Sequence, residues 1–370
     1  MKKLLFFANK SFQINFLHRN LSSSSALIYK SFGDPPSVIE KIDTTKDVLE
    51  KKLGPGQIRL KYLASPVNPA DINTIQGVYG VKPPLPSFPG NEGVAQVIEV
   101  GPDVSQVSKG DWVIPADSGT GTWRSHSLST EDLVVRVPGK VGEGNLDIFA
   151  AASLCVNPPT AYRMLKDFVR LKEEDCIIQN GANSSVGTTV IQLCNTWGIK
   201  SINVIRSRPD GSHKEIEKEL MDLGATVVVT EEQLQEKETI AEIIENFPKA
   251  RLALNCVGGK AAADCIRLMS FQGVMVTYGA MSKKPIPLPA GPLIFQDMRF
   301  VGYWNTRWIK GRPVDDPERV TMMSDLCHLY QTNKLKAAKT LPFTLDNYKD
   351  ALTKAVDPSF NQGKVVFVSK

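Results

Sequence analysis

One stretch decides the fold: CIIQNGANSSVG, residues 176–187. Its apolar beginning, Cys176–Asn180, predicts a short buried strand, and we expect a helix from about Thr188 to Trp197. The residues between them are small, so that backbone amides and the helix N-terminus can approach an anion, as in loops that bind dinucleotide phosphates. The match to GxGxxG is incomplete because Asn183 replaces the middle glycine, and an ordinary strand-to-helix turn is the alternative.

Downstream of this stretch the sequence alternates strands with helices. Ile216, Leu220 and Leu223 follow a helical spacing and precede Gly224, a natural helix stop. The alternation predicts a doubly wound parallel sheet with helices on both faces and a ligand at the carboxyl ends of its strands. Further strands are expected at Ser201–Ile205, Thr226–Val229, Leu252–Val257 and Val274–Tyr278.

The end of the second expected strand indicates which dinucleotide binds. In NAD-binding proteins an acid about 20 residues beyond the loop receives the ribose 2′-hydroxyl, whereas an arginine accommodates a 2′-phosphate. Nineteen residues beyond Gly187 the sequence gives Arg206-Ser207-Arg208, with no acid before Asp210. Guanidinium groups bind phosphate in bidentate fashion. We therefore expect NADPH rather than NADH, with a solvated pair of surface arginines as the alternative.

The region before residue 160 has a different spacing of apolar residues. Residues 56 to about 138 are rich in Gly and Pro and alternate apolar with polar side chains, which predicts a compact, barrel-like β unit. A later helical run contains Val320, Met323, Cys327 and Tyr330 and leads to a final strand. Periodicity leaves open whether this tail joins the parallel sheet or the β unit. The strands expected outside the parallel sheet are Ile58–Tyr62, Val94–Val100, Trp112–Ile114, Leu133–Val137 and Lys364–Val368.

The net charge of +5 is confined to the N-terminal region. The 370 residues include 44 Lys and Arg against 39 Asp and Glu, yet residues 1–33 contain five basic residues and no acid. This Ser-rich, acid-free segment is typical of a mitochondrial transit peptide, with cleavage expected between Arg19 and Gly33; a disordered N-terminus is the alternative. Residues 34–370 are neutral, so charge gives no sign of a nucleic-acid partner, and no apolar run is long enough to span a membrane.

The sequence lacks the spacing patterns of metal and nucleophile sites. Its six cysteines are widely separated without a CxxC pair, its four histidines form no HExxH, and no GxSxG elbow occurs. We therefore expect isolated buried thiols, no metal site and no nucleophilic catalysis.

Several longer motifs resemble one family. The sequence is similar to the zinc-free, quinone oxidoreductase-like branch of the medium-chain dehydrogenase/reductase superfamily, and within it to mitochondrial trans-2-enoyl-thioester (enoyl-CoA/ACP) reductases. The zinc enzymes carry His-Glu where Asn91-Glu92 stands, and their four-cysteine zinc lobe is absent here. The motifs that carry the resemblance are Asn68–Asn73, Gln76–Gly80, Gly90–Ala95, Gly110–Pro115, Asn157–Met164 and Leu254–Gly259.

The resemblance implies an α/β fold of two parts. A GroES-like β-barrel catalytic domain would comprise residues 34–157 and 319–370, with the C-terminal tail rejoining it. A Rossmann NADPH-binding domain with a doubly wound parallel sheet would comprise residues 158–318. The family's enzymes are homodimers.

The resemblance also implies the site residues. Tyr79 falls on the catalytic tyrosine, and Ser185 stands where relatives more often have glycine, which bears on cofactor affinity rather than class. Trp304 is expected either along the acyl cleft or in the core. The positions on NADPH-contacting segments are Asn157, Asn183, Ser184, Ser185, Val186, Arg206, Ser207, Arg208, Tyr278, Gly279, Ala280, Met281, Tyr303, Trp304, Asn305 and Lys364.

The implied reaction is NADPH-dependent reduction of trans-2-enoyl thioesters, on acyl carrier protein or CoA, in mitochondrial fatty acid synthesis. Hydride adds to the β-carbon, and Tyr79 stays protonated at neutral pH and can supply the proton for the α-carbon. The alternatives are a zinc-free NADPH quinone or alkenal reductase, and a non-catalytic NADPH-binding protein like the lens crystallin relatives. An acidic carrier protein would suit Lys283-Lys284 or Arg307, Lys310 and Arg312, unless these are solvated surface.

Overall fold

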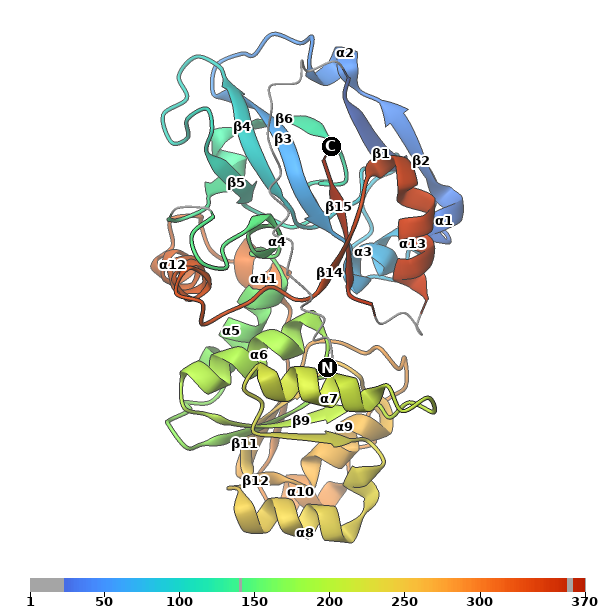
Figure 1. Ribbon diagram of the computed structural model, residues 1–370, viewed down its shortest axis with the longest axis vertical. Coiled ribbons are helices and arrows are strands. Elements are labelled where there is room, and N and C mark those ends of the chain that lie inside the picture. The colour runs from blue at the N-terminus through green and yellow to red at the C-terminus, as the bar shows by residue number, and fades with distance from the viewer. Residues whose placement is uncertain (1–22, 140–141, 358–361, 370) are drawn as a thin grey trace, which may run out of the picture.

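Two large sheets, one above the other in Figure 1, organise the chain. The computed structural model describes residues 23–139, 142–357 and 362–369. Helices α5 (Asn157–Asp167), α11 (Asn305–Lys310) and α12 (Pro317–Gln331) lie at the level where the two sheets meet. The site residues predicted from both parts of the sequence can therefore meet at this junction.

The lower sheet has six parallel strands, in the order β10-β9-β8-β11-β12-β13. This confirms the doubly wound sheet and its five expected strands, whereas β13 was not expected because none of its four residues is buried. The strands are β8 (Cys176–Asn180), β9 (Lys200–Ile205), β10 (Val227–Thr230), β11 (Ala250–Asn255), β12 (Met269–Thr277) and β13 (Arg299–Gly302).

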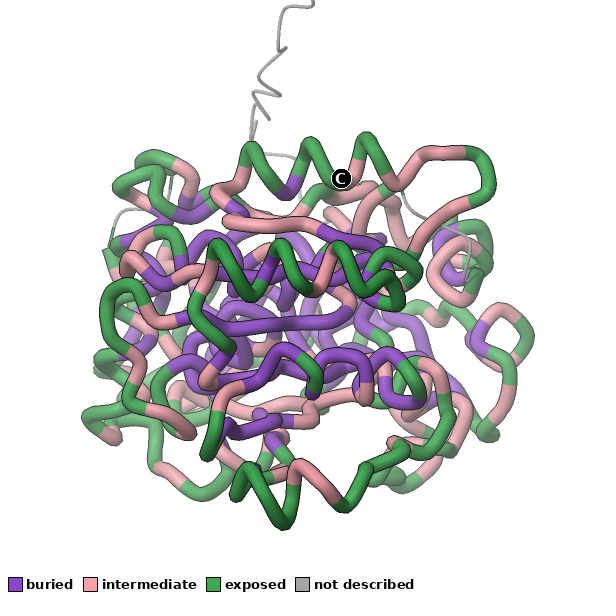
Figure 2. The backbone as a smooth tube through the Cα atoms, turned by 90° about the horizontal axis from the view of Figure 1, so that it is seen from below, coloured by how far each residue is buried: buried purple, intermediate pink, exposed green. Residues whose placement is uncertain are grey.

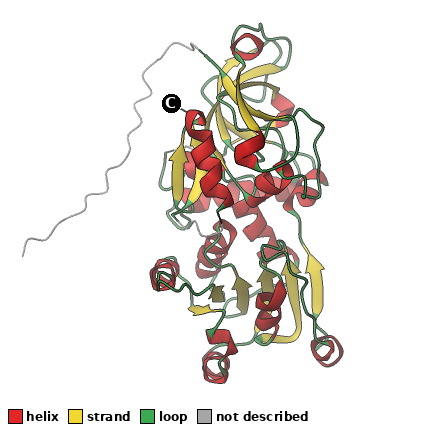
Figure 3. Cartoon of the chain, turned by 90° about the vertical axis from the view of Figure 1, so that its right-hand side faces the viewer, coloured by secondary structure: helices red, strands yellow, loops and turns green. Residues whose placement is uncertain are grey.

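Helices cover both faces of the parallel sheet. One core contains side chains of α5, α6 and the strands, and a second, on the other face, contains those of α8 and α9. Figure 2 shows the buried strands between these rows of helices, and Figure 3 shows the same layers from the side. The helices of this part are α6 (Ser185–Thr196), α7 (His213–Asp222), α8 (Lys237–Asn246), α9 (Gly259–Ile266) and α10 (Ala290–Phe295).

The upper sheet has seven strands, in the order β14-β15-β3-β4-β5-β7, with β6 also paired to β3. The final strand β15 pairs antiparallel with β3, at Val366 opposite Pro66, so the C-terminal tail rejoins the β unit and the question left open by periodicity is settled. The strands are β3 (Gln57–Pro66), β4 (Val94–Val100), β5 (Trp112–Pro115), β6 (His126–Thr130), β7 (Val134–Arg136), β14 (Thr340–Phe343) and β15 (Lys364–Val368).

A two-stranded hairpin lies beside the upper sheet. It joins β1 (Ser25–Tyr29) to β2 (Ile39–Asp43), and Leu27 and Tyr29 are buried in a core shared with β15. Residues 1–22 of the predicted transit peptide lie outside the described residues, whereas the rest of that segment includes β1. The remaining elements are α1 (Pro35–Val38), α2 (Thr45–Val48), α3 (Pro69–Ile75), α4 (Ile148–Ala152), α13 (Tyr348–Val356) and the short turns η1 (Glu131–Leu133), η2 (Gln233–Gln235) and η3 (Leu345–Asn347).

Two further expectations concern the chain as a whole. All six cysteines are free and buried, as predicted. Within the described ranges, no helix has the length and apolarity that crossing a membrane requires.

Candidate active site

Tyr79 lies in the loop that follows α3. The helix begins with a reciprocal cap, in which the Asn68 backbone amide donates to Asp71 Oδ2 at 2.7 Å. At its other end, the backbone amides of Val78 and Tyr79 both donate to the Asn73 carbonyl, at 3.0 and 3.1 Å. The loop is therefore hydrogen-bonded to the end of a capped helix, and the backbone of Tyr79 has a fixed position relative to α3.

The Tyr79 hydroxyl is held by Trp304. The indole Nε1–H donates to the hydroxyl oxygen at 3.0 Å, and the two rings meet edge to face at 6.3 Å. Burial raises the pKa of the half-buried Tyr79, the hydrogen bond from Trp304 opposes this rise, and the charge of Asp71 adds to it. The hydroxyl thus keeps its proton at neutral pH, and its O–H remains able to donate to a ligand.

Hydrogen bonds also hold the residues on either side of Trp304. The Tyr303 hydroxyl donates to Asn305 Oδ1 at 3.0 Å, and the Asn305 side-chain amide donates to the Cys155 carbonyl at 2.9 Å. Cys155 lies just before α5, which begins with Asn157. This segment therefore links Trp304 to the start of a helix that carries another predicted site residue.

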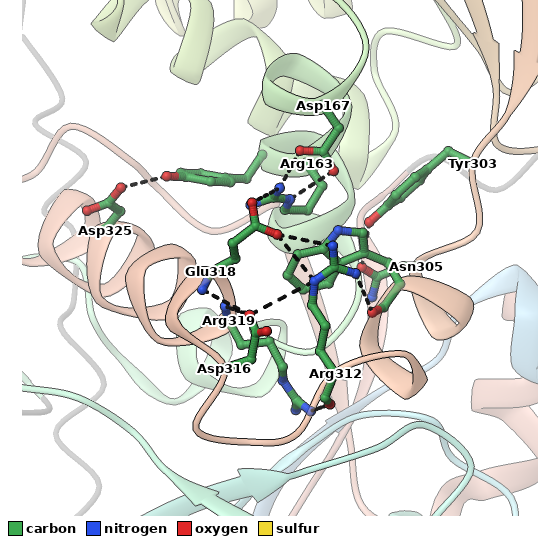
Figure 4. A network of polar contacts seen from close by, with 11 residues as sticks. Arg163, Asp167, Tyr303, Asn305, Arg312, Asp316, Glu318, Arg319 and Asp325 are labelled. Carbon is green, nitrogen blue, oxygen red and sulfur yellow. Dashed lines mark hydrogen bonds and ion pairs between the residues drawn. The ribbon is translucent and has the colours of Figure 1, made fainter.

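Arg163, Arg312 and Glu318 form an ion-pair network that holds α11 in place (Figure 4). The guanidinium groups of Arg163 and Arg312 lie 4.4 and 4.2 Å from the centroid of the Trp308 ring. Glu318 on α12 accepts from both arginines, at 3.4 Å from Arg163 and 3.1 Å from Arg312. Because Trp304 caps α11, this clamp between α5, α11 and α12 also fixes the partner of Tyr79.

A second predicted group meets in the interior beside α3. The Asn157 amide donates to Asn68 Oδ1 at 3.1 Å, and the Lys364 ammonium donates to the same oxygen. The Asn68 amide donates in turn to the buried carboxylate of Glu92 at 2.7 Å. Asn157 and Lys364, far apart in the sequence, are thus joined through Asn68.

The loop after β8 is shaped for an anion. Helix α6 begins at Ser185, three residues earlier than expected, because Ser184 caps it: its hydroxyl accepts from the Gly187 amide at 3.1 Å. A Cβ on Gly187 would lie 2.4 Å from the Ala182 carbonyl oxygen, so the tight loop requires glycine there. The first amides of a helix have no intrahelical acceptor, so those of Ser185 and Val186 can bind a phosphate, with exposed Asn183 beside them.

The neighbouring strand ends complete this edge of the sheet. The loop with Arg206, Ser207 and Arg208 follows β9, which pairs with β8, and Arg206 is exposed there while the other two are partly buried. The segment Tyr278–Met281 follows β12, and the Met281 backbone amide donates to the Cys256 carbonyl at 2.9 Å. Among the described residues the buried Tyr278 hydroxyl has no hydrogen-bond partner, which leaves a polar group for a ligand. These features fit a dinucleotide phosphate group.

A partly open cavity of about 310 Å³ lies beside Cys155. Because Cys155 lines it and its carbonyl accepts from Asn305, the cavity borders the segment that carries Trp304. The lining is mainly apolar and includes Ile114, Leu154, Ile309, Val320, Met322 and Met323. Such a cavity suits an aliphatic chain.

Sequence reasoning missed three groups that support these residues. Asn68 and Glu92 stand in motifs that carried the family resemblance, but their spacing gave no sign of a joint role. No sequence pattern predicted the cluster around Trp308 either, because Arg163 and Arg312 come from different helical runs. As for metals, no group of three or more His, Cys, Asp or Glu side chains in the described ranges is arranged to hold an ion.

Comparison with known proteins finds matches for both parts of the chain. Two family models match it: the alcohol dehydrogenase GroES-like domain over residues 54–156 and the zinc-binding dehydrogenase over residues 185–316. The mitochondrial enoyl-[acyl-carrier-protein] reductase of Xenopus tropicalis is 41% identical over 96% of this chain and 99% of its own length. That of Rattus norvegicus is 43% identical over 90% of this chain and 86% of its own.

Solved structures of such reductases are similar to this chain as well. A mitochondrial 2-enoyl thioester reductase heterodimer from Candida tropicalis has a TM-score of 0.86 at 34% identity and covers 94% of this chain and 100% of its own. A complex of a reductase of that type with NADP and crotonyl-CoA has a TM-score of 0.85 at 34% identity over the same shares. A putative NADPH:quinone reductase from Bacillus thuringiensis is more distant, with a TM-score of 0.78 at 25% identity, and covers 94% of this chain and 99% of its own.

Proposed function

This chain belongs to the family of mitochondrial enoyl-[acyl-carrier-protein] reductases, and we propose that it reduces trans-2-enoyl thioesters to saturated acyl thioesters with NADPH in mitochondrial fatty acid synthesis. The observation that carries the reaction is the Tyr79 hydroxyl, protonated and held by Trp304 at 3.0 Å. Simple quinone reduction needs no such proton donor for carbon.

The cofactor residues follow from the strand ends. Asn183, Ser184, Ser185 and Val186 would hold the pyrophosphate at the start of α6, and Arg206, Ser207 and Arg208 the 2′-phosphate. When bound, NADPH supplies hydride to the substrate β-carbon. The other proposed contacts are Asn157, Tyr278, Gly279, Ala280, Met281, Tyr303, Trp304, Asn305 and Lys364.

Tyr79 would complete the reduction by giving its proton to the α-carbon. Negative charge collects on the thioester oxygen as hydride adds, and that enolate is far more basic than a tyrosinate. The Trp304 N–H points at the Tyr79 oxygen, so it stabilises the charge that remains there after proton transfer. In this pair, Tyr79 would donate the proton and Trp304 would hold the Tyr79 hydroxyl in position.

The apolar cavity beside Cys155 would receive the acyl chain. Its wall includes Cys155, whose carbonyl accepts from Asn305, and the α12 residues Val320, Met322 and Met323. Of the basic residues expected to dock a carrier protein, Lys310 lies 3.8 Å from Asp117 and Arg312 pairs with Glu318 at 3.1 Å. Arg307 is exposed, with its guanidinium 5.7 Å from the Trp304 ring centroid, and is the better candidate.

The domain boundaries and the leader follow the same proposal. Residues 158–318 would form the NADPH-binding domain, and residues 34–157 with 319–370 the catalytic domain. Because β1 is buried in the catalytic part, the mitochondrial leader would end between Arg19 and Ser24 rather than at residue 33.

The proposed assembly is a homodimer. Strand β13 forms one edge of the parallel sheet, and exposed apolar side chains gather on α10 nearby. A second copy of this chain would cover both, since unpaired edges and apolar patches are sites of association. The side chains on α10 are Leu293, Ile294 and Phe295.

The test of this function is a competition between substrate classes. Protein lacking residues 1–22 is incubated with NADPH and either a trans-2-enoyl-CoA, the same acyl group on acyl carrier protein, or 1,4-naphthoquinone, and NADPH oxidation is followed. Turnover of the enoyl thioesters with formation of the saturated product is expected. Turnover of the quinone alone would overturn the proposal.

A further inference from the structure

Three adjacent strands of the parallel sheet end in polar residues whose side chains contact one another. Asn180 ends β8, Asn255 ends β11 and Thr277 ends β12. Both asparagines are 0% exposed, and a buried amide is costly unless its polar atoms are hydrogen-bonded. The function proposed above assigns none of these three side chains a role.

Asn255 connects the three strand ends. Its Nδ2 donates to Thr277 Oγ1 at 3.1 Å. Its Oδ1 accepts from Asn180 Nδ2 at 2.8 Å and from the Gly258 backbone amide at 3.0 Å. A backbone N–H can only donate, so the oxygen of Asn255 must face Gly258, and its nitrogen must face Thr277. The row of contacts therefore has a single orientation.

Asn180 reaches from β8 to the segment that follows β11. Its Oδ1 accepts from the backbone amides of Cys256 at 2.9 Å and Val257 at 3.3 Å. The next residue, Gly181, opens the phosphate-binding loop, and a Cβ there would lie 2.5 Å from Cys256 Sγ. Asn180 therefore holds the start of the phosphate-binding loop against the segment after β11.

The segment Tyr278–Met281 packs on the same backbone. The Met281 amide donates to the Cys256 carbonyl at 2.9 Å, and a Cβ on Gly279 would lie 3.0 Å from that carbonyl oxygen. This segment follows Thr277 directly, so the hydrogen bond from Asn255 to Thr277 holds its beginning as well. The position of Tyr278–Met281 relative to the phosphate-binding loop thus depends on this row of side chains.

The order of the strands indicates which part of the cofactor these segments would meet. Arg206 and Arg208, proposed to bind the 2′-phosphate, follow β9, and the phosphate-binding loop follows β8. A dinucleotide that begins at the end of β9 and passes the end of β8 continues toward β11 and β12. The nicotinamide half of NADPH would therefore lie beside Tyr278–Met281.

We propose that Asn180, Asn255 and Thr277 are positioning residues for the nicotinamide half of NADPH: their hydrogen bonds set the separation between the phosphate-binding loop and Tyr278–Met281. The proposal rests on the proposed function, in which both segments contact NADPH. The pyrophosphate and the nicotinamide are joined covalently, so both are bound well only where the two protein segments are spaced to match. A spacing fixed before binding lowers the cost of ordering the site.

Binding of two ligands, measured by isothermal titration calorimetry, tests this. NADPH has both halves, whereas adenosine 2′,5′-bisphosphate has only the half that carries the 2′-phosphate. Asn255→Ala removes three hydrogen bonds. It is expected to raise the dissociation constant of NADPH by about tenfold or more and that of the bisphosphate by less than about twofold.

A milder pair of variants probes the other end of the row. Thr277→Val removes the hydroxyl that accepts from Asn255 and keeps a side chain of similar shape. It is expected to raise the dissociation constant of NADPH by about threefold or more, again with little effect on the bisphosphate. Thr277→Ser keeps the hydroxyl and should bind NADPH as the unaltered protein does.

A control variant separates positioning from stability. Leu252→Ala removes a fully buried apolar side chain from the same strand as Asn255. It should lower the melting temperature, while the ratio of the two dissociation constants stays unchanged. Circular dichroism reports folding in every variant. If Asn255→Ala does not fold, the comparison of Thr277→Val with Thr277→Ser decides.

The outcomes against the proposal are distinct. Normal NADPH binding by Asn255→Ala or by Thr277→Val overturns it, and so does an equal loss of both ligands, which shows a purely structural role. A Thr277→Ser protein that binds as poorly as Thr277→Val also overturns it. In these cases the unaltered protein still reduces enoyl thioesters, and the proposed function stands. If the unaltered protein does not bind NADPH, the cofactor assignment fails and this proposal fails with it.

Discussion

At the residue scale, Tyr79 has the properties of a proton donor at neutral pH. Burial raises the pKa of its hydroxyl, so the hydroxyl keeps its proton until substrate charge develops. Because Trp304 donates to the same oxygen, negative charge left there after transfer is stabilised. These properties support the proposal that Tyr79 donates the proton and that Trp304 stabilises the oxygen that loses it.

Replacing Tyr79 should therefore affect turnover rather than cofactor binding. Tyr79→Phe is expected to lower kcat for an enoyl-CoA by about 10²–10⁴-fold, the usual contribution of a positioned acid. The dissociation constant of NADPH should stay unchanged, as measured by fluorescence titration. Trp304→Phe is the matched comparison: it removes the indole N–H but leaves the proton on Tyr79, so its loss of kcat should be smaller. An unchanged kcat in Tyr79→Phe would remove this residue from the mechanism.

His126 determines part of the acid sensitivity of the protein. Burial, with the charges of Lys61 and Arg59, lowers the pKa of His126 to about 4. The folded state therefore resists protonation that the unfolded chain accepts below its ordinary pKa of about 6.5. Since the unfolded state then binds more protons, stability is complete above this value and is lost as the pH falls toward 4.

The size of this effect can be measured against His126→Gln. Between pH 7 and pH 5 the free energy of unfolding of the unaltered protein should fall by about 2 kcal/mol more than that of the variant. Urea denaturation at the two pH values gives both numbers. Equal pH dependence in the two proteins would mean that the pKa of His126 is the same in the folded and unfolded states.

At the element scale, the proposed role of the loop after β9 is to select the nicotinamide cofactor that binds. Arg206 and Arg208 follow β9 at the edge where the phosphate-binding loop follows β8. Replacing both by Ala should raise the dissociation constant of NADPH by at least about tenfold, because a phosphate loses charged partners. NADH lacks the 2′-phosphate, so its binding should change little. Equal weakening of both cofactors would refute this role for the arginines.

The chain length that the enzyme accepts should depend on α12. Met323 lies on this helix and lines the apolar cavity beside Cys155. Met323→Trp fills part of the cavity and should lower kcat/KM for a ten-carbon enoyl-CoA by about tenfold or more, while crotonyl-CoA is reduced normally. Met221→Trp, at an exposed position on α7, is the control. A uniform loss over all chain lengths would mean that the acyl chain lies elsewhere.

The sequence predicted those elements in which buried residues follow one another or recur at a regular spacing. Cys176–Asn180 and Lys364–Val368 were predicted with their observed bounds, because each is a continuous apolar run or alternates regularly. The start of α6 was placed too late because the Ser184 cap depends on side-chain geometry that periodicity does not register. Strand β13 was missed because none of its four residues is buried, and only its pairing with β12 defines it.

At the scale of the whole molecule, tertiary structure brings together residues that sequence patterns cannot connect. The Lys364 ammonium and the Asn68 side chain touch although they are 296 positions apart. No local period links them, and only the return of β15 to β3 makes the contact possible. The family motifs are the basis on which Tyr79 and the cofactor segments are proposed, whereas the hydrogen bond from Asn68 to Glu92 is visible only in three dimensions.

Assembly is the last property that belongs to the whole molecule. Ile294 and Phe295 are 69% and 78% exposed on α10, which is more apolar surface than a solvated helix needs. A double substitution, Ile294→Glu with Phe295→Glu, should convert the proposed dimer into a monomer, because it would place charges in the buried interface.

Sedimentation velocity distinguishes the two states. The unaltered protein should sediment as a dimer and the double variant as a monomer, with unchanged circular dichroism. Leu133→Glu, which changes an apolar side chain 55% exposed between β6 and β7, is the control and should remain dimeric. If the α10 variant still sediments as a dimer, the copies associate through another surface. A monomeric unaltered protein would reject the dimer itself, because α10 and the β13 edge would then be solvated in solution.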